Sequence, residues 1–269
     1  MITDRNAVGT SRLEGTFAAC RADDRAALIG YLPVGYPTVA DSLTTLRTMV
    51  AAGCDVVEVG IPYSDPVMDG PTIAKATQVA LANGSRVRDV FAAVETVADA
   101  GAAPVVMVYW NLVLKYGVDA FARDLAAAGG LGLITPNLIP DEGAEWEAAS
   151  DAHRLDRIYL VAPSSTPERL AMTLDHCRGF VYASSTMGVT GARDAVSNLA
   201  PELCARIREH SDIPIGVGLG VRSGAQAAEI AEYADGVIVG SAIVSASEQG
   251  QEAVAALVSE LADGVRGNA

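Results

Sequence analysis

The feature that most constrains the fold is a regular alternation of short apolar runs with longer, alanine-rich segments of helical periodicity. The runs are apolar throughout, which is typical of parallel strands that are covered on both faces. Eight such runs occur, at residues 27–32, 56–60, 105–109, 131–135, 157–161, 180–184, 214–218 and 236–240. Eight strand–helix units in 269 residues favour a closed barrel over an open sheet. We therefore predict an α/β fold, a (β/α)8 TIM barrel in which residues 1–269 form a single domain.

Helix boundaries can also be predicted. Thr38 is suited to cap a helix over residues 39–52. Before the first strand, Ser11 and Glu14 have the spacing of a capping box, which predicts an extra N-terminal helix. A further short helix is expected at residues 241–247, after the eighth strand.

Charge and composition exclude several classes of protein. The chain has 19 Lys and Arg against 33 Asp and Glu, and its basic residues are scattered singly, so it lacks the basic stripe that nucleic acid requires. No apolar run approaches the ~18 residues of a membrane span, and the first fifteen residues contain no signal-peptide core. The four cysteines are far apart and form no CxxC motif, which favours free thiols. We expect an acidic, soluble, cytoplasmic protein.

Glu58 is the first candidate catalytic residue. It lies in the middle of the second apolar run, VVEVG at residues 56–60. Glutamate is rarely fully buried unless it is paired or functional, and dehydration raises its pKa towards neutrality. Such a pKa suits a group that both accepts and donates a proton. The alternative is a buried glutamate with a purely structural hydrogen bond.

Asp69 is the second candidate, eleven residues further on, in the loop 61–71. The loops after strands two and six (61–71 and 184–198) are the long ones, and the ends of barrel strands carry the chemistry of this fold. Three prolines restrict the first of these loops, which helps to place one carboxylate accurately. Asp69-Gly70 is equally consistent with an ordinary turn.

Glycine-containing segments follow strands six, seven and eight, at residues 188–191, 218–222 and 240–242. Glycine lets backbone N–H groups approach an anion closely, and a helix N-terminus adds its dipole. TIM barrels frequently bind phosphate with the loops after strands seven and eight. The three segments together indicate a phosphorylated ligand.

Missing residue types exclude other chemistry. The two lysines, Lys75 and Lys115, do not lie on strands, so neither a Schiff-base aldolase nor a pyridoxal enzyme is supported. The three histidines show no metal-binding spacing, and no GxGxxG follows the first strand. The remaining possibility is acid–base chemistry that carboxylates perform on a phosphorylated substrate, without a cofactor or a metal ion. Carbon–carbon cleavage would then require a substrate that supplies its own electron sink.

Three motifs carry a family resemblance: VEVGIPYSDPVMDGPTI (57–73), STMGVTGAR (185–193) and GVGLGV (216–221). The chain closely resembles the α subunit of tryptophan synthase, and the resemblance extends from the N-terminal helix to IVGSAIV (238–244). The family's reaction is the retro-aldol cleavage of indole-3-glycerol phosphate to indole and glyceraldehyde 3-phosphate, a lyase step in tryptophan biosynthesis. It agrees with the exclusions, because indole protonated at carbon 3 acts as the electron sink.

The resemblance implies roles for individual residues. Glu58 matches the family's acid/base, Asp69 the carboxylate that binds the indole N–H, and Tyr182 a site tyrosine near Glu58. The remaining matches are to the indole pocket (Tyr31, Met107), the lid over the substrate (Thr190, Gly191) and the phosphate site (Gly220, Gly240, Ser241). The alternative for Tyr182 is a structural role, in which its aromatic ring fills a layer of the barrel.

The resemblance also implies a partner, a β subunit in an α2β2 complex that receives indole through a tunnel and holds pyridoxal phosphate. We expect the contact on the loop that contains Pro62, Asp65 and Pro66, and on the loop after strand three. Asn137 and Leu112 depart from residues that are frequent in the family, Asp and Pro respectively.

Two other functions stay open at this point. Another phosphate-binding barrel, such as a sugar-phosphate isomerase or epimerase, would share the phosphate loops but would not account for Glu58 and Asp69. A barrel that only activates a β subunit allosterically would be expected to have lost Glu58, Asp69 or Tyr182, and all three are present.

Overall fold

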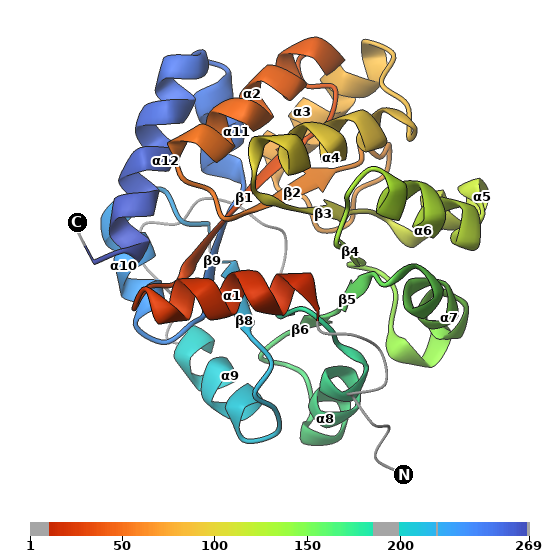
Figure 1. The fold of residues 1–269 in the computed structure, drawn as a ribbon, viewed down its shortest axis with the longest axis vertical. Helices are drawn as coiled ribbons and strands as arrows, with labels where there is room; N and C mark the ends of the chain where they lie inside the picture. Colours follow the sequence, from red (N-terminus) through yellow and green to blue (C-terminus); the bar gives the residue numbers. More distant parts are fainter. Residues whose placement is uncertain (1–10, 185–198, 219, 268–269) are drawn as a thin grey trace.

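The computed structural model describes residues 11–184, 199–218 and 220–267 (Figure 1). All strand pairs are parallel, and the sheet has the order β5-β4-β3-β2-β1-β9-β8-β7-β6. The strands are β1 (Ala27–Pro33), β2 (Val56–Gly60), β3 (Ala103–Met107), β4 (Gly132–Ile134), β5 (Asp156–Ile158), β6 (Leu160–Val161), β7 (Val181–Ser184), β8 (Ile215–Gly218) and β9 (Gly236–Val239).

The sheet curves into a barrel that closes through residues 156–161. β5 pairs with β4 at one end of the strand order and β6 pairs with β7 at the other, and only Tyr159 separates β5 from β6. The backbone N–H of Tyr182 donates to the carbonyl oxygen of Tyr159 at 3.1 Å. The fifth predicted strand is therefore one segment divided at Tyr159, and the prediction of a TIM barrel is confirmed.

Helices surround the barrel on the outside and cover one of its ends (Figure 1). They are α1 (Arg12–Ala22), α2 (Val39–Ala52), α3 (Pro71–Ala82), α4 (Asp89–Ala100), α5 (Trp110–Tyr116), α6 (Val118–Ala127), the 3-10 helix η1 (Pro140–Glu142), α7 (Ala144–His153), α8 (Pro167–His176), α9 (Leu199–Arg208), α10 (Gly224–Ala231), α11 (Ser241–Ser247) and α12 (Gln251–Val265). Helices α2 and α11 span the residues predicted for them. Thr38 caps α2 by accepting a hydrogen bond from the backbone N–H of Asp41.

The predicted N-terminal helix, α1, lies across one end of the barrel (Figure 1). Its buried side chains Leu13, Phe17 and Cys20 belong to the same apolar cluster as side chains from inside the barrel. Ser11 accepts a hydrogen bond from the Glu14 N–H at 3.1 Å and donates one to the buried Asp156 carboxylate at 2.6 Å. Helix α1 therefore fills the end at which the strands begin, and the end at which they finish remains for chemistry.

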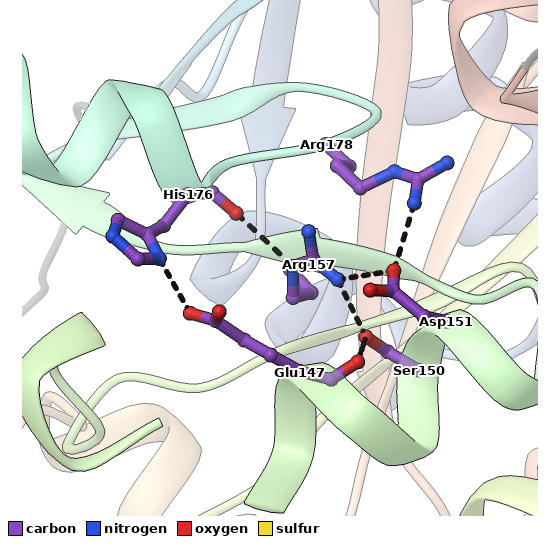
Figure 2. A network of polar contacts seen from close by, with 6 residues as sticks. All are labelled: Glu147, Ser150, Asp151, Arg157, His176 and Arg178. Carbon is purple, nitrogen blue, oxygen red and sulfur yellow. Dashed lines mark hydrogen bonds and ion pairs between the residues drawn. The ribbon is translucent and has the colours of Figure 1, made fainter. Parts of the chain in front are cut away.

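A second polar cluster ties helices and strands together beside β5 (Figure 2). The Arg157 guanidinium donates to Ser150 Oγ at 2.8 Å and to an Asp151 carboxylate oxygen at 2.6 Å. Arg178 binds the same Asp151 oxygen at 2.9 Å, and His176 contacts Glu147 at 2.6 Å. These contacts join α7, β5 and the end of α8 where the barrel closes.

All four cysteines are buried and are free thiols, as their spacing predicted. Among the residues that the structure describes, every helix is too short or too polar to cross a lipid bilayer.

Asp55 fixes the start of β2 against β1. Its two carboxylate oxygens accept hydrogen bonds from the Arg25 guanidinium at 2.8 and 2.9 Å, and one of them also accepts the backbone N–H of Leu28 at 2.9 Å. Both side chains of the ion pair are largely buried, with exposed fractions of 16% for Arg25 and 14% for Asp55. A two-point contact in this setting is stronger than a surface ion pair.

We expect Asp55→Ala to lower the free energy of unfolding by about 2–4 kcal/mol, because it removes two hydrogen bonds from a largely buried guanidinium and leaves the Leu28 N–H without its acceptor. Urea titration followed by circular dichroism measures the change. Arg123→Ala, which breaks the exposed contact between Arg123 and Asp124, is the control and should leave the stability nearly unchanged. Equal effects of the two variants would contradict the role given to Asp55.

Candidate active site

A cavity opens at the end of the barrel where the strands finish. Most of the residues predicted for the site line it: Tyr31, Glu58, Asp69, Met107, Tyr182, Gly220, Gly240 and Ser241. They come from β1, β2, β3, β7 and from the loops after β2, β8 and β9, which are far apart in the sequence. The predicted lid residues Thr190 and Gly191 lie outside the described residues.

Glu58 stands on the inner face of β2. Val56, two residues earlier, belongs to the interior cluster that α1 closes, so period-two alternation directs Glu58 inward, above that cluster. The side chain is 1% exposed, and its Oε1 atom has no hydrogen-bond partner among the described residues. Burial raises the pKa of Glu58 to about 8, so the carboxyl is protonated at neutral pH.

Asp69 enters the cavity from the loop between β2 and α3. It is only partly buried, and a hydrogen bond from the Tyr109 hydroxyl at 3.4 Å favours its charged form. Burial raises the pKa of Asp69 to about 6, with the Tyr109 hydrogen bond acting in the opposite direction. At neutral pH Asp69 is therefore ionised while Glu58 is protonated, which is the separation of roles that acid–base catalysis requires.

Two tyrosines flank the carboxylates, and each lies against a glycine of the neighbouring strand. A Cβ atom on Gly60 would collide with the Tyr31 ring and hydroxyl, and one on Gly218 would lie 2.7 Å from the Tyr182 hydroxyl. Burial is the main cause that raises the pKa of both tyrosines, and the charges of Glu58 and Asp69 add to it. Both hydroxyls are therefore protonated and close to the two carboxyl groups.

Part of the cavity lining has the residue types of an anion site. Gly220, Gly240 and Ser241 line it, and Gly240 and Ser241 form the start of α11. Glycine allows a close approach to the backbone, which is the property expected of a phosphate site.

Several lining residues were not predicted from the sequence: Met68, Ile73, Leu160, Ser184 and Ile238. Leu160 and Ile238 lie on predicted strands. Side chains on a strand alternate between its two faces, so counting in steps of two along each strand could have identified these residues as inward-facing, as Tyr182 is. Tyr109 was also missed, because its contact with Asp69 joins residues 40 positions apart in the chain.

Asn137, one of the two departures from the family pattern, makes a contact at the start of α5. Its Oδ1 atom accepts the backbone N–H of Trp110 at 2.8 Å, which caps the start of α5. An amide oxygen serves this purpose without a charge. The structure gives no reason for Leu112, which packs at the edge of the core.

Nothing in the described part of the chain resembles a metal centre, since no group of three or more His, Cys, Asp or Glu side chains is placed to hold an ion.

Comparison with known proteins identifies the family. The model of the family described as tryptophan synthase alpha chain matches residues 17–266. The chain belongs to this family. It is 70% identical over 256 residues to the tryptophan synthase alpha chain of Nocardia farcinica, covering 95% of this chain and 96% of that one. It is 68% identical to the Mycobacterium tuberculosis protein of the same name, covering 95% of each.

Solved structures agree with this assignment. The structure of Mycobacterium tuberculosis tryptophan synthase matches with a TM-score of 0.93 at 67% identity, covering 96% of this chain and 99% of that one. A chain of the tryptophan synthase complex from Pyrococcus furiosus matches with a TM-score of 0.80 at 30% identity, covering 88% and 98%. The known role of the tryptophan synthase alpha family is the lyase reaction that cleaves indole-3-glycerol phosphate.

Gly60 keeps the space that the Tyr31 side chain occupies. We expect Gly60→Ala to lower the free energy of unfolding by about 1–3 kcal/mol, because the added methyl group forces the buried Tyr31 ring to move. Thermal unfolding measures the loss. The control is Gly15→Ala in α1, where a Cβ would meet nothing within 4 Å; it should be neutral or slightly stabilising. A Gly60→Ala protein as stable as the control would contradict the close approach.

Proposed function

We propose that this chain cleaves indole-3-glycerol phosphate with Glu58 as proton donor and acceptor and with Asp69 as the carboxylate that binds the indole N–H. The observation that supports this is one cavity with two carboxyl groups whose pKa values differ, about 8 for Glu58 and about 6 for Asp69. A protonated acid and an ionised carboxylate are thus available at the same pH.

The reaction follows from these protonation states. Glu58 donates its proton to carbon 3 of the indole ring, and the positive charge that forms on the ring nitrogen is stabilised by the ionised Asp69. The Glu58 carboxylate then takes the proton of the glycerol hydroxyl next to the ring. As that C–O bond becomes a carbonyl, the carbon–carbon bond breaks and its electron pair neutralises the ring. Indole and glyceraldehyde 3-phosphate leave, and Glu58 is again protonated.

The other lining residues bind the substrate. Tyr31 and Met107, with Ile73, Leu160 and Ile238, provide the apolar side chains that an indole ring requires. Tyr182 lies close to Glu58 and is placed to hydrogen-bond to it or to the glycerol hydroxyls. Gly220, Gly240 and Ser241 bind the phosphate through backbone N–H groups. Thr190 and Gly191, which lie outside the described residues, are assigned to the lid on the family resemblance alone.

A β subunit is the proposed partner, in an α2β2 complex that transfers indole through a tunnel. Exposed apolar side chains gather on the segments after adjacent strands β2, β3 and β4: Val67 is 69% exposed, Leu114 52% and Ile139 42%. Asp65 and Pro66 lie on the same loop as Val67 and are exposed and half-buried respectively, whereas Pro62 is buried. Exposed apolar side chains of this kind are expected at an interface.

Pyridoxal phosphate is proposed to belong to the β subunit alone. The cofactor needs a lysine that points into its site. Lys75 lies on α3, is 67% exposed and pairs with Glu248, and Lys115 lies on α5; neither lines the cavity. This chain therefore offers no residue that fits the cofactor.

We also propose a single domain over residues 1–269 and a cytoplasmic location.

Release of indole from indole-3-glycerol phosphate by the purified chain tests the function. We expect slow release alone, faster release with the β subunit, and a loss of about 10²–10⁴-fold in Glu58→Gln, which cannot donate or accept the proton. Glu95→Gln, an exposed glutamate on α4, is the control and should retain full activity. No release by the folded wild-type chain with or without the partner would refute the enzymatic function.

The pH profile of kcat/KM is expected to be bell-shaped. Activity should rise as pH increases through about 6, where Asp69 loses its proton, and fall above about 8, where Glu58 loses the proton that it must donate. Initial rates at low substrate concentration from pH 5 to pH 9 measure both limbs. In Asp69→Asn the acid limb should disappear from the residual activity. A profile that is flat between pH 5 and pH 7 in the wild type would contradict the assignment of Asp69.

A further inference from the structure

Tyr109 connects the end of β3 with the loop that carries Asp69. It directly precedes α5, and its ring is buried, with 6% of its surface exposed. Its hydroxyl accepts the backbone N–H of Met68 at 3.2 Å and lies 3.4 Å from Asp69 Oδ1, to which it donates. One hydroxyl group therefore contacts both the backbone and the side chain of the loop, at two consecutive residues.

The Tyr109 ring is held by its neighbours. Tyr63, from the beginning of the same loop, packs against it with ring centroids 5.0 Å apart and an angle of 34° between the planes. The Tyr63 hydroxyl accepts a hydrogen bond from the side-chain amide of Asn111 at 3.2 Å. The next residue after Tyr109, Trp110, is anchored to Asn137. The hydroxyl is thus presented by the barrel and α5 rather than by the loop itself.

Asp69 depends on such support because it stands at the end of a ten-residue loop, 61–70, that has no regular secondary structure. A carboxylate that stabilises a developing charge must keep its orientation, since a displacement of about 1 Å can cost up to 10²-fold in rate. Glu58 needs no comparable support, because strand β2 fixes its backbone on both sides through β1 and β3.

We propose that Tyr109 is a positioning residue for the reaction: its hydroxyl holds Met68 and Asp69 so that the Asp69 carboxylate is directed into the cavity at the indole nitrogen. This inference rests on the proposed function. Tyr109 does not itself line the cavity, so it acts through Asp69 and not on the substrate.

The same hydrogen bond influences the charge of Asp69. Burial raises the pKa of Asp69, and the Tyr109 hydroxyl opposes this rise by stabilising the carboxylate. The titratable groups that face Asp69 from the surrounding elements are Glu58 on β2, Tyr31 on β1 and Tyr182 on β7. Glu58 is neutral below its pKa of about 8, and the tyrosines stay protonated, so Asp69 titrates against an uncharged environment in the acid range.

Tyr109→Phe tests the proposal, because phenylalanine keeps the ring contact with Tyr63 and removes only the hydroxyl. With the full chain and saturating β subunit we expect kcat to fall about tenfold with little change in KM, because binding of the phosphate is not affected. The acid limb of the pH profile should move to higher pH, since the carboxylate loses a donor. Indole release across pH 5–9 measures both effects.

Tyr116→Phe is the matched control. It also removes a tyrosine hydroxyl that donates to an aspartate, Asp124, at 2.6 Å, but on the outside of the barrel. It should change neither kcat nor the acid limb. A Tyr109→Phe enzyme with a wild-type kcat and an unmoved acid limb would overturn the positioning role, while the losses in Glu58→Gln and Asp69→Asn would still support the proposed function. A loss of kcat without movement of the limb would show a general loosening of the loop and would equally overturn it.

Discussion

Dehydration of a single glutamate is the constraint around which this barrel is organised. Glu58 lies on an inward-facing position of β2 with strands hydrogen-bonded on both sides, so water cannot solvate its carboxylate. Its pKa rises to about 8 for this reason alone. A buried carboxyl oxygen without a hydrogen-bond partner, as Glu58 Oε1 is among the described residues, costs stability, and such costs are typically found where a protein performs chemistry.

The rest of the interior supports that position. Below Glu58 the barrel is filled by apolar side chains and is closed by Leu13, Phe17 and Cys20 of α1, so that water has no access from that end. Above it, Gly60 and Gly218 leave room for the Tyr31 and Tyr182 rings, which border the cavity. The filled end supplies stability and the open end supplies chemistry, a division that is common in this fold.

The second carboxyl group is placed by different means. Asp69 lies on a loop and is only partly buried, so its pKa rises less, to about 6, and it is ionised at neutral pH. The hydroxyl of Tyr109, which lies between β3 and α5, accepts the Met68 N–H and donates to the Asp69 carboxylate. Two carboxyl groups therefore differ in protonation state at neutral pH, because one is fixed by a strand inside a closed sheet and the other by a loop at its rim.

Much of this could be predicted from the sequence. Continuous apolar runs determine parallel strands, the capping residues Ser11 and Thr38 determine helix starts, and a glutamate inside VVEVG can only be a dehydrated one. These are local properties, set by neighbours within a few residues. The division of the fifth strand at Tyr159, the contact of Tyr109 with Asp69 and the cap that Asn137 provides were decided by tertiary structure. Each depends on groups that lie far apart in the sequence and that closure of the barrel brings together. The periodicity of apolar residues predicts only local structure and says nothing about such contacts.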